Sequence, residues 1–213
     1  MKEAISVVMP VYLGEYSTAA MDDRPLKFRR AINSFLTQGG VEKELVIVVD
    51  GCDQAWEICE KECQGFKAEI TYIWIAKQQT FSGEVRNIGK AQARHPLICY
   101  LDSDDFLGEG HLQAVVQQFS DDVGWVYWTD SVVTYYEHLL AYSSVPRLLD
   151  FEQAAVGTSN IAHRKSLDVM WPDGYGHDWL FVERLRAFPG EEIKDTCYNV
   201  CHIPMANSEN HEV

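Results

Sequence analysis

The sequence predicts an α/β fold, built on a Rossmann-like, mostly parallel central sheet with helices on both faces. Apolar, β-branched runs alternate with segments of helical periodicity through the first half of the chain. Several of these runs stop abruptly at an aspartate or a turn-forming residue. The length of 213 residues suffices for one well-buried domain and is short for two. We therefore expect a single domain over residues 1–213.

The first half of the chain supplies the alternation of strands and helices. A β-branched run over residues 4–9 predicts the first buried strand, and residues 13–27 read as a long loop. The expected elements that follow are a helix over 26–37, a strand over 45–49, a helix over 55–63, a strand over 70–75, a helix over 83–94 and a strand ending at Asp102. This order favours parallel strand pairing with crossover helices.

The second half is less regular. We expect a helix from Gly110 to Phe119, strands over 123–129 and 132–136, a helix over 176–186 and a polar, irregular tail from Cys197. No internal repeat, low-complexity segment or linker interrupts the chain.

Candidate binding residues follow three of the predicted parallel strands. Pro10 and Tyr12 come after the first strand, Asp50 after the second, and Asp102 after the strand that begins at Leu97. Ligands of open α/β sheets bind at the carboxyl ends of the strands. We therefore expect these residues to meet at one edge of the sheet and to form a binding site.

An acidic cluster ends the strand that begins at Leu97. Asp102, Asp104 and Asp105 place three carboxylates in four positions, and these charges repel one another unless a divalent ion or hydrogen-bond donors neutralise them. Oxygen ligands suit Mg²⁺ or Mn²⁺, which commonly share their coordination with substrate phosphates. The alternative is a solvated loop in which Asp104 or Asp105 caps a helix beginning near Phe106.

The composition narrows the classes of partner. Eighteen lysines and arginines against 32 aspartates and glutamates give a formal charge of −14, with no basic stripe. This balance disfavours nucleic-acid binding, and it means that an anionic substrate needs a metal or local donors.

The chain carries no signal-peptide pattern and no run of eighteen apolar residues, so we expect a cytoplasmic protein. Peripheral association with the inner face of a membrane stays open, although no basic amphipathic helix supports it. The six cysteines lack the spacing of a disulfide framework, and we expect reduced thiols. Cys59 and Cys63 form only a weak zinc signal, and we assign them no chemistry.

Seven sequence motifs, in this order and spacing, resemble the family 2 glycosyltransferases of the GT-A fold. They run from Val7 to Tyr12, Leu45 to Gly51, Gly83 to Gly89, Tyr100 to Asp105, Gly157 to Asn160 with His163 and Arg164, Gly176 to Leu180, and Tyr198 to His202 with Asn207 and Ser208. The resemblance covers nearly the whole chain. It implies a nucleotide-binding half over about 1–105 and an acceptor-binding half over about 106–213.

The resemblance implies a divalent metal cofactor, Mn²⁺ or Mg²⁺. Asp104 would coordinate the ion directly, while Asp102, with Ser103 beside it, would contact the nucleotide's ribose or hold the metal through water. His202 matches a C-terminal histidine that completes the coordination in some members, and an imidazole ligand favours Mn²⁺ somewhat. The alternative for His202 is a surface histidine in a frayed tail.

The resemblance also places the nucleotide. Asp50 would accept hydrogen bonds from the base, Pro10 and Tyr12 would line the same pocket, and Arg86 would reach over the base or diphosphate. The sequence departs from the family by having one acid before Gly51 where two adjacent acids are usual. The alternatives are a turn residue for Asp50 and a solvated helix face for Arg86.

For catalysis the resemblance points to Asp178. Inversion at the anomeric carbon needs a carboxylate that takes the proton of the acceptor hydroxyl. Asp178 matches the second acid of the family's acidic pair, and His177 replaces the first. The alternative is a helix N-cap, in which case another carboxylate such as Asp173 would act. Nearby aromatic residues, suited to sugar stacking or to the core, are Trp171, Tyr175, Trp179 and Tyr135-Tyr136.

The expected function is transfer of a sugar, with inversion, from a nucleotide diphospho-sugar to a hydroxyl acceptor. The resemblance favours a UDP-linked donor and a saccharide or lipid-linked acceptor, in bacterial polysaccharide or glycolipid synthesis. One alternative is a noncatalytic nucleotide-sugar binding protein. The other, a sugar nucleotidyltransferase, is disfavoured because the first strand ends in Pro10-Val-Tyr12 and not in a glycine-rich phosphate loop.

Overall fold

The computed structural model describes residues 4–14, 23–78, 81–136, 141–147, 149–151, 156–194 and 196–201. Its elements in chain order are β1 (Ile5–Val11), α1 (Arg24–Leu36), β2 (Lys43–Asp50), α2 (Asp53–Glu62), η2 (Gln64–Phe66), β3 (Ile70–Ile75), α3 (Gly83–Gln92), β4 (Leu97–Tyr100), β5 (Phe106–Leu107), α4 (His111–Gln118), β6 (Trp125–Trp128), β7 (Ser131–Tyr136), β8 (Ala141–Pro146), η4 (Thr158–Asn160), β9 (Ile161–Arg164), α5 (His177–Leu185), β10 (Gly190–Ile193) and β11 (Tyr198–Val200).

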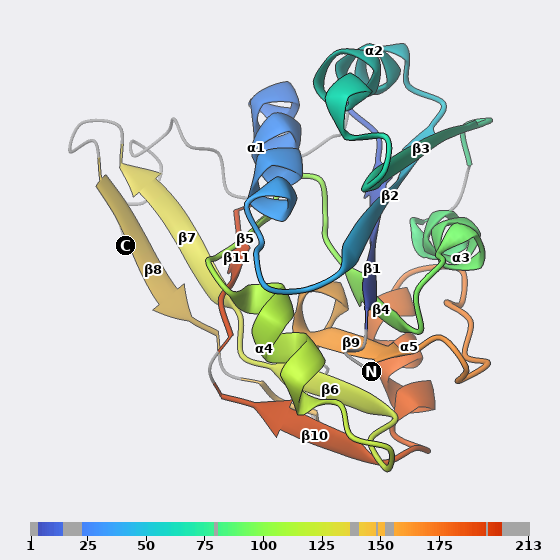
Figure 1. Ribbon diagram of the computed structural model, residues 1–213, viewed down its shortest axis with the longest axis vertical. Helices are drawn as coiled ribbons and strands as arrows, with labels where there is room; N and C mark the ends of the chain where they lie inside the picture. Colours follow the sequence, from blue (N-terminus) through green and yellow to red (C-terminus); the bar gives the residue numbers. More distant parts are fainter. Residues whose placement is uncertain are drawn as a thin grey trace.

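A seven-stranded sheet in the order β10-β6-β9-β4-β1-β2-β3 forms the centre, and a four-stranded sheet in the order β5-β11-β7-β8 lies beside it (Figure 1). β1 pairs in parallel with β2 and β4, and β2 with β3. Among the described strands of the seven-stranded sheet, only β9 runs antiparallel to its two neighbours, β4 and β6. The prediction of a mostly parallel central sheet is therefore confirmed.

Helices cover both faces of the central sheet. Side chains of α1, α2 and α4, such as Phe28, Ile58 and Leu112, pack with strand residues into one apolar core. On the other face, α5 packs through Phe181, and α3 contributes Val85 against β2. The central strands are buried on both faces, which explains why they read as continuous apolar runs.

Two local predictions are wrong. The expected loop over 13–27 is shorter, because α1 begins at Arg24 with a proline in its first turn; proline fits there since the first helical N–H groups need no intrahelical partner. Residues 15–22 of that loop lie outside the described part of the chain. The tail expected to be irregular from Cys197 contains β11, which pairs with β5 and β7 and has a fully buried Tyr198.

Two glycines position the ligand-binding edge. Gly51 has φ +60°, and a Cβ there would lie 2.6 Å from the backbone nitrogen of Lys77, so the turn after β2 approaches the end of β3 closely. A Cβ on Gly89 would lie 2.4 Å from Cγ1 of Val8, so α3 rests directly on β1. This close packing places the Arg86 side chain near the carboxyl end of β4.

All six cysteines are free thiols, and five of them are buried. Within the described residues, every helix is too short or too polar to cross a membrane.

Candidate active site

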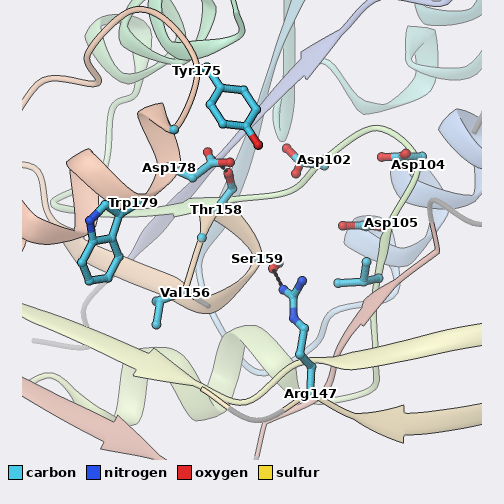
Figure 2. Close-up of a pocket in the computed structure, with 13 residues that line it drawn as sticks. Asp102, Asp104, Asp105, Arg147, Val156, Thr158, Ser159, Tyr175, Asp178 and Trp179 are labelled. Carbon is cyan, nitrogen blue, oxygen red and sulfur yellow. Dashed lines mark hydrogen bonds between the residues drawn. The ribbon is translucent and has the colours of Figure 1, made fainter. Parts of the chain in front are cut away.

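A cavity of about 500 Å³ brings several predicted site residues together (Figure 2). Its wall combines the loop after β4, the segment around η4, the start of α5, the residue after β8 and one residue of β11. The lining residues are Asp102, Asp104, Asp105, Arg147, Val156, Gly157, Thr158, Ser159, Tyr175, Gly176, Asp178, Trp179 and Val200. The candidate metal-binding acids and the candidate base therefore face one cavity.

The three clustered acids occupy different environments. Asp102 is partly exposed and pairs with Nη2 of Arg86 at 2.7 Å. Asp105 is 3% exposed, and its two oxygens accept hydrogen bonds from the Tyr198 hydroxyl at 3.0 Å and the Cys201 N–H at 2.7 Å. Asp104 is half-buried beside the cavity and has no side-chain hydrogen bond to another described residue. Of the three, Asp104 is the acid best placed to bind a ligand directly.

The cap alternative for Asp104 and Asp105 is wrong. Phe106 begins the short strand β5, and the next helix, α4, starts at His111 with Gly110 in the N-cap position.

The acids repel one another. Burial raises the pKa of Asp102, with further contributions from Asp104 and Asp178, while Arg86 opposes the shift. Burial and the charges of Asp104 and Asp102 raise the pKa of Asp105 well above its usual value. A cation at this wall would relieve that repulsion.

The donor set fits a divalent ion that shares its coordination with a substrate. Asp102 and Asp104 supply hard carboxylate oxygens, as Mg²⁺ and Mn²⁺ prefer. The described residues hold no cluster of three or more metal-ligating side chains, so the remaining ligands must come from elsewhere. Substrate phosphates and water commonly fill that role. His202 lies outside the described residues.

Arg86 connects the acid loop to the candidate base. It is 4% exposed, its Nη1 lies 2.9 Å from Nε2 of His177, and its guanidinium lies over the Trp171 ring. Its Nη1 also lies 3.7 Å from Oδ1 of Asp178. Although burial opposes its charge, the carboxylates of Asp102 and Asp178 raise the pKa of Arg86. The alternative of a solvated helix face is therefore wrong.

His177 contacts both Arg86 and Asp178. Its Nδ1 lies 3.1 Å from the Gly174 carbonyl and donates to it, while its Nε2 lies 2.9 Å from Nη1 of Arg86 and 3.2 Å from Oδ1 of Asp178.

Asp178 lies in the first turn of α5, with Gly176 in the N-cap position at φ +78°. The N-cap alternative for Asp178 is therefore wrong. Its Oδ1 accepts a hydrogen bond from the Thr158 hydroxyl at 2.8 Å, and its side chain is 43% exposed beside the cavity. A negative charge in the first turn interacts favourably with the helix dipole, and a carboxylate beside the cavity could serve as a general base. Asp173 is exposed and does not line the cavity.

The residues predicted to bind the base of the nucleotide do not line the cavity. They lie at the ends of β1 and β2. Asp50 is 6% exposed; its oxygens contact Lys77 Nζ at 2.7 Å and the Gln78 N–H at 2.6 Å. Lys77 Nζ also lies 4.4 Å above the Tyr12 ring. Lys77 thus joins Tyr12 and Asp50, while Pro10 lies within β1. Sequence reasoning missed Lys77, although its position directly after the strand over 70–75 could have indicated it.

The aromatic residues divide between core and cavity. Trp171 is buried and stacks on Phe181 with ring centroids 3.9 Å apart. Tyr175 is 92% exposed at the cavity, which Trp179 also lines. The side chains of Tyr135 and Tyr136 lie outside the described part of the structure.

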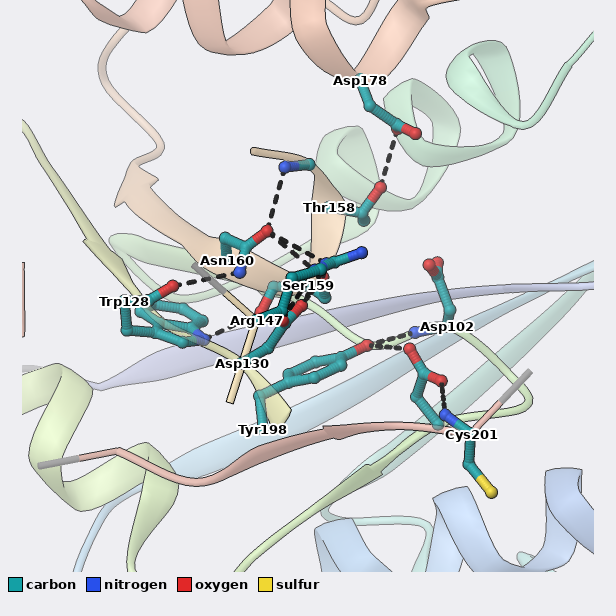
Figure 3. A network of polar contacts seen from close by, with 12 residues as sticks. Asp102, Trp128, Asp130, Arg147, Thr158, Ser159, Asn160, Asp178, Tyr198 and Cys201 are labelled. Atoms are coloured by element: carbon teal, nitrogen blue, oxygen red, sulfur yellow. Dashed lines mark hydrogen bonds and ion pairs between the residues drawn. The ribbon is translucent and has the colours of Figure 1, made fainter. Parts of the chain in front are cut away.

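A polar network that the sequence did not reveal supports the opposite wall (Figure 3). Nε of Arg147 donates to the fully buried Asp130 at 2.9 Å, and its Nη2 contacts the same carboxylate and the Ser159 hydroxyl. Asn160 closes the network by donating to the Trp128 carbonyl at 3.0 Å. These partners are distant in sequence, so no local pattern announced them.

Comparisons with known proteins agree with this geometry. Glycosyl transferase family 2 matches residues 6–168. The glycosyltransferase GlyG of Streptococcus pneumoniae serotype 4 is 27% identical over 125 residues, 57% of this chain and 36% of GlyG.

Two solved structures share the fold. S. aureus TarS 1–349, in complex with UDP-GlcNAc, superposes with a TM-score of 0.69 at 19% identity, over 92% of this chain and 58% of TarS. The mannosyltransferase PcManGT from Pyrobaculum calidifontis, in complex with GDP-Man and Mn²⁺, has a TM-score of 0.67 at 12% identity, over 94% of this chain and 57% of PcManGT. The chain thus spans well under two thirds of these relatives. Its fold is the GT-A fold, and the chain belongs to glycosyl transferase family 2.

Proposed function

We propose that this chain transfers a sugar from a nucleotide diphospho-sugar to an acceptor hydroxyl, with inversion at the anomeric carbon and with Mn²⁺ or Mg²⁺ as cofactor. The observation that carries the proposal is the cavity that Asp102, Asp104 and Asp178 line together. Arg86 lies behind its wall and contacts both Asp102 and Asp178. Family membership supports sugar transfer in general. TarS with UDP-GlcNAc and PcManGT with GDP-Man support a nucleotide-sugar donor, and we favour UDP.

The donor would occupy the edge formed by the ends of β1, β2 and β4. Tyr12 and Asp50 would hold the base, with Pro10 in the same wall, and Lys77 would exchange its contact with Asp50 for one with the nucleotide. Asp102 and Ser103 would contact the ribose or diphosphate side. This division follows the proposed halves, with residues 1–105 for the donor and 106–213 for the acceptor.

Asp104 and Asp102 would hold the divalent ion, with His202 as a further ligand. When bound, the ion offsets the negative charge that develops on the departing diphosphate. Arg86 holds Asp102 in place through its 2.7 Å contact and adds a buried positive charge to the same wall.

Asp178 would take the proton of the acceptor hydroxyl as that oxygen attacks the anomeric carbon from the face opposite the diphosphate. The Thr158 hydroxyl orients the carboxylate by donating to Oδ1, which leaves Oδ2 for the acceptor. Thr158, Ser159, Tyr175 and Trp179 give the cavity hydroxyls and aromatic faces suited to a saccharide or lipid-linked acceptor. We place the reaction in bacterial polysaccharide or glycolipid synthesis.

Calorimetric titration of UDP, GDP, CMP and dTDP, with and without Mn²⁺, tests the proposal. We expect one nucleotide, UDP, to bind in a metal-dependent way, and the corresponding nucleotide-sugar to be turned over when saccharide acceptors are supplied. Binding without turnover would favour a noncatalytic nucleotide-sugar binding protein. No binding of any of the four would overturn the donor site.

A further inference from the structure

The third acid of the cluster, Asp105, connects the acid loop, residues 102–105, to β11 through buried hydrogen bonds (Figure 3). One of its oxygens accepts the Tyr198 hydroxyl at 3.0 Å, and the other accepts the Cys201 N–H at 2.7 Å. Tyr198 is fully buried, and Asp105 and Cys201 are 3% and 1% exposed. Both carboxylate oxygens are thus committed to donors of the C-terminal segment.

The Tyr198 hydroxyl also holds the other end of the acid loop. While it donates its proton to Asp105, it accepts the Asp102 backbone N–H at 3.0 Å. The Asp105 N–H in turn donates to the Asp102 carbonyl at 3.0 Å, which closes a tight turn. Asp104 stands inside this turn, and one tyrosine hydroxyl binds both its first residue, Asp102, and its last, Asp105.

The same carboxylate reaches the segment that leads to His202. The Cys201 N–H that Asp105 accepts belongs to the residue directly before His202 in the sequence. Tyr198 lies three positions earlier in β11, which pairs with β5 immediately after the acid loop. The turn that contains Asp104 is therefore joined to β11 and Cys201 through two buried side chains.

We propose that Tyr198 and Asp105 are positioning residues for the divalent-ion site, and that Asp105 is not itself a ligand. They hold the turn that contains Asp104 against β11 and Cys201, so that the Asp104 carboxylate would be pre-arranged for a divalent ion. This inference rests on the proposed function. Outer-shell hydrogen-bond partners of this kind commonly contribute ten- to a hundredfold to metal affinity.

The variant Tyr198→Phe removes the shared hydroxyl and keeps the ring in the core. We expect Mn²⁺ to bind about tenfold more weakly in the presence of UDP, or of GDP measured in parallel, as followed by the electron paramagnetic resonance signal of free Mn²⁺. In turnover assays, the Mn²⁺ concentration for half-maximal rate should rise by a similar factor, with kcat largely recovered at saturating Mn²⁺.

Tyr100→Phe is the matched control. Tyr100 is also fully buried, and its hydroxyl lies 2.9 Å from Nε2 of His163, on the opposite face of the sheet. The control loses the same kind of hydrogen bond without touching the acid loop, so its Mn²⁺ affinity should stay at the wild-type value. Equal losses in both variants would show general destabilisation and overturn the proposal.

A second variant covers the case in which Tyr198→Phe does not fold. Asp105→Asn keeps the size of the side chain but replaces one acceptor oxygen by an NH2 donor, so either the Tyr198 hydroxyl or the Cys201 N–H loses its acceptor. We expect the same loss of Mn²⁺ affinity.

The outcomes for the two proposals differ. A wild-type protein that binds no nucleotide with Mn²⁺ overturns the proposed function and this inference together. A wild-type protein that binds, with a Tyr198→Phe or Asp105→Asn variant of unchanged Mn²⁺ affinity, overturns only the positioning role.

Discussion

The two ends of the site are built in different ways. At the proposed donor end, defined by Tyr12, Asp50 and Asp102, each residue ends or follows a strand of the central sheet, and parallel pairing of β1 with β2 and β4 brings them to one edge. At the proposed acceptor end, defined by Arg147, Thr158 and Asp178, the residues come from different elements joined by polar side-chain contacts. Regular strand pairing suffices to assemble the first end, whereas the second depends on individual side-chain interactions.

The largest effect is expected from a substitution at the proposed acceptor end. It tests whether this end supplies the catalytic base. Asp178→Asn keeps the Thr158 contact possible but removes the base, so turnover should fall by about 10²- to 10⁴-fold while the nucleotide Kd stays within about twofold. Paired steady-state kinetics and calorimetry measure both quantities. Asp173→Asn, exposed and outside the cavity lining, is the matched control and should retain activity. Retained turnover in Asp178→Asn would refute the assignment of the base.

A second variant isolates the donor end. Asp104→Ala removes a carboxylate that no other described side chain binds, so the fold should persist while metal-dependent nucleotide binding weakens by about a hundredfold or more. Nucleotide titration with and without Mn²⁺ checks this, and thermal unfolding confirms that the variant is folded. An unchanged metal dependence would remove Asp104 from the site.

Disrupting the polar network around Asp130 and Arg147 should mainly lower the stability of the fold. Asp130→Asn leaves the Arg147 guanidinium without its buried counter-charge and should lower the free energy of unfolding by about 2 kcal/mol, since Arg147 is itself partly exposed. Denaturant titration gives the value. Glu183→Gln breaks a partly exposed pair with Arg186 and should change it by less than about 1 kcal/mol. Equal effects would mean that the network contributes no more than a surface pair.

The smallest expected effect is a pH dependence that arises away from both ends. Burial lowers the pKa of His163 to about 4, while an unfolded histidine titrates near 6.5. The unfolded state therefore binds more protons between these values. Stability is fully present above about pH 6.5 and falls as the pH drops towards 4.

His163→Gln should flatten this decline, as measured by denaturant titration at several pH values. Burial also lowers the pKa of His111, to about 3, so part of the slope should persist in the variant. An identical slope in both proteins would show that His163 does not carry the effect.

The donor end could be anticipated because its signals are local. A β-branched run that stops at Asp50 or Asp102 indicates both a buried strand and the residue exposed at its end. The role of Tyr198 could not be anticipated in this way. β11 is three residues long, and its partners in β5 and β7 are separated from it by more than sixty positions along the chain. A short strand shows little periodicity, so only pairing with distant strands stabilises it.

Arg86 and Asp105 show the same limit for single side chains. A helical position predicts that Arg86 lies near the sheet, but its burial beneath Asp102 and Asp178 follows from the packing of α3 on β1 through Gly89. Three acids in four positions predict that something must neutralise them. In the structure Arg86 pairs with Asp102, Tyr198 and Cys201 donate to Asp105, and no other described side chain binds the Asp104 carboxylate.

The sequence alone therefore determined the α/β class, the order of the central strands and helices, and the acids at the strand ends. These features depend on hydrophobic periodicity and on the residues that end strands and helices. Both signals extend over only a few residues. Only the tertiary structure decided which of these acids accept hydrogen bonds from the protein and which has no such bond to a described residue. That outcome depends on donors such as the Tyr198 hydroxyl, which the fold brings from 93 residues away, and on burial that makes each unpaired charge costly.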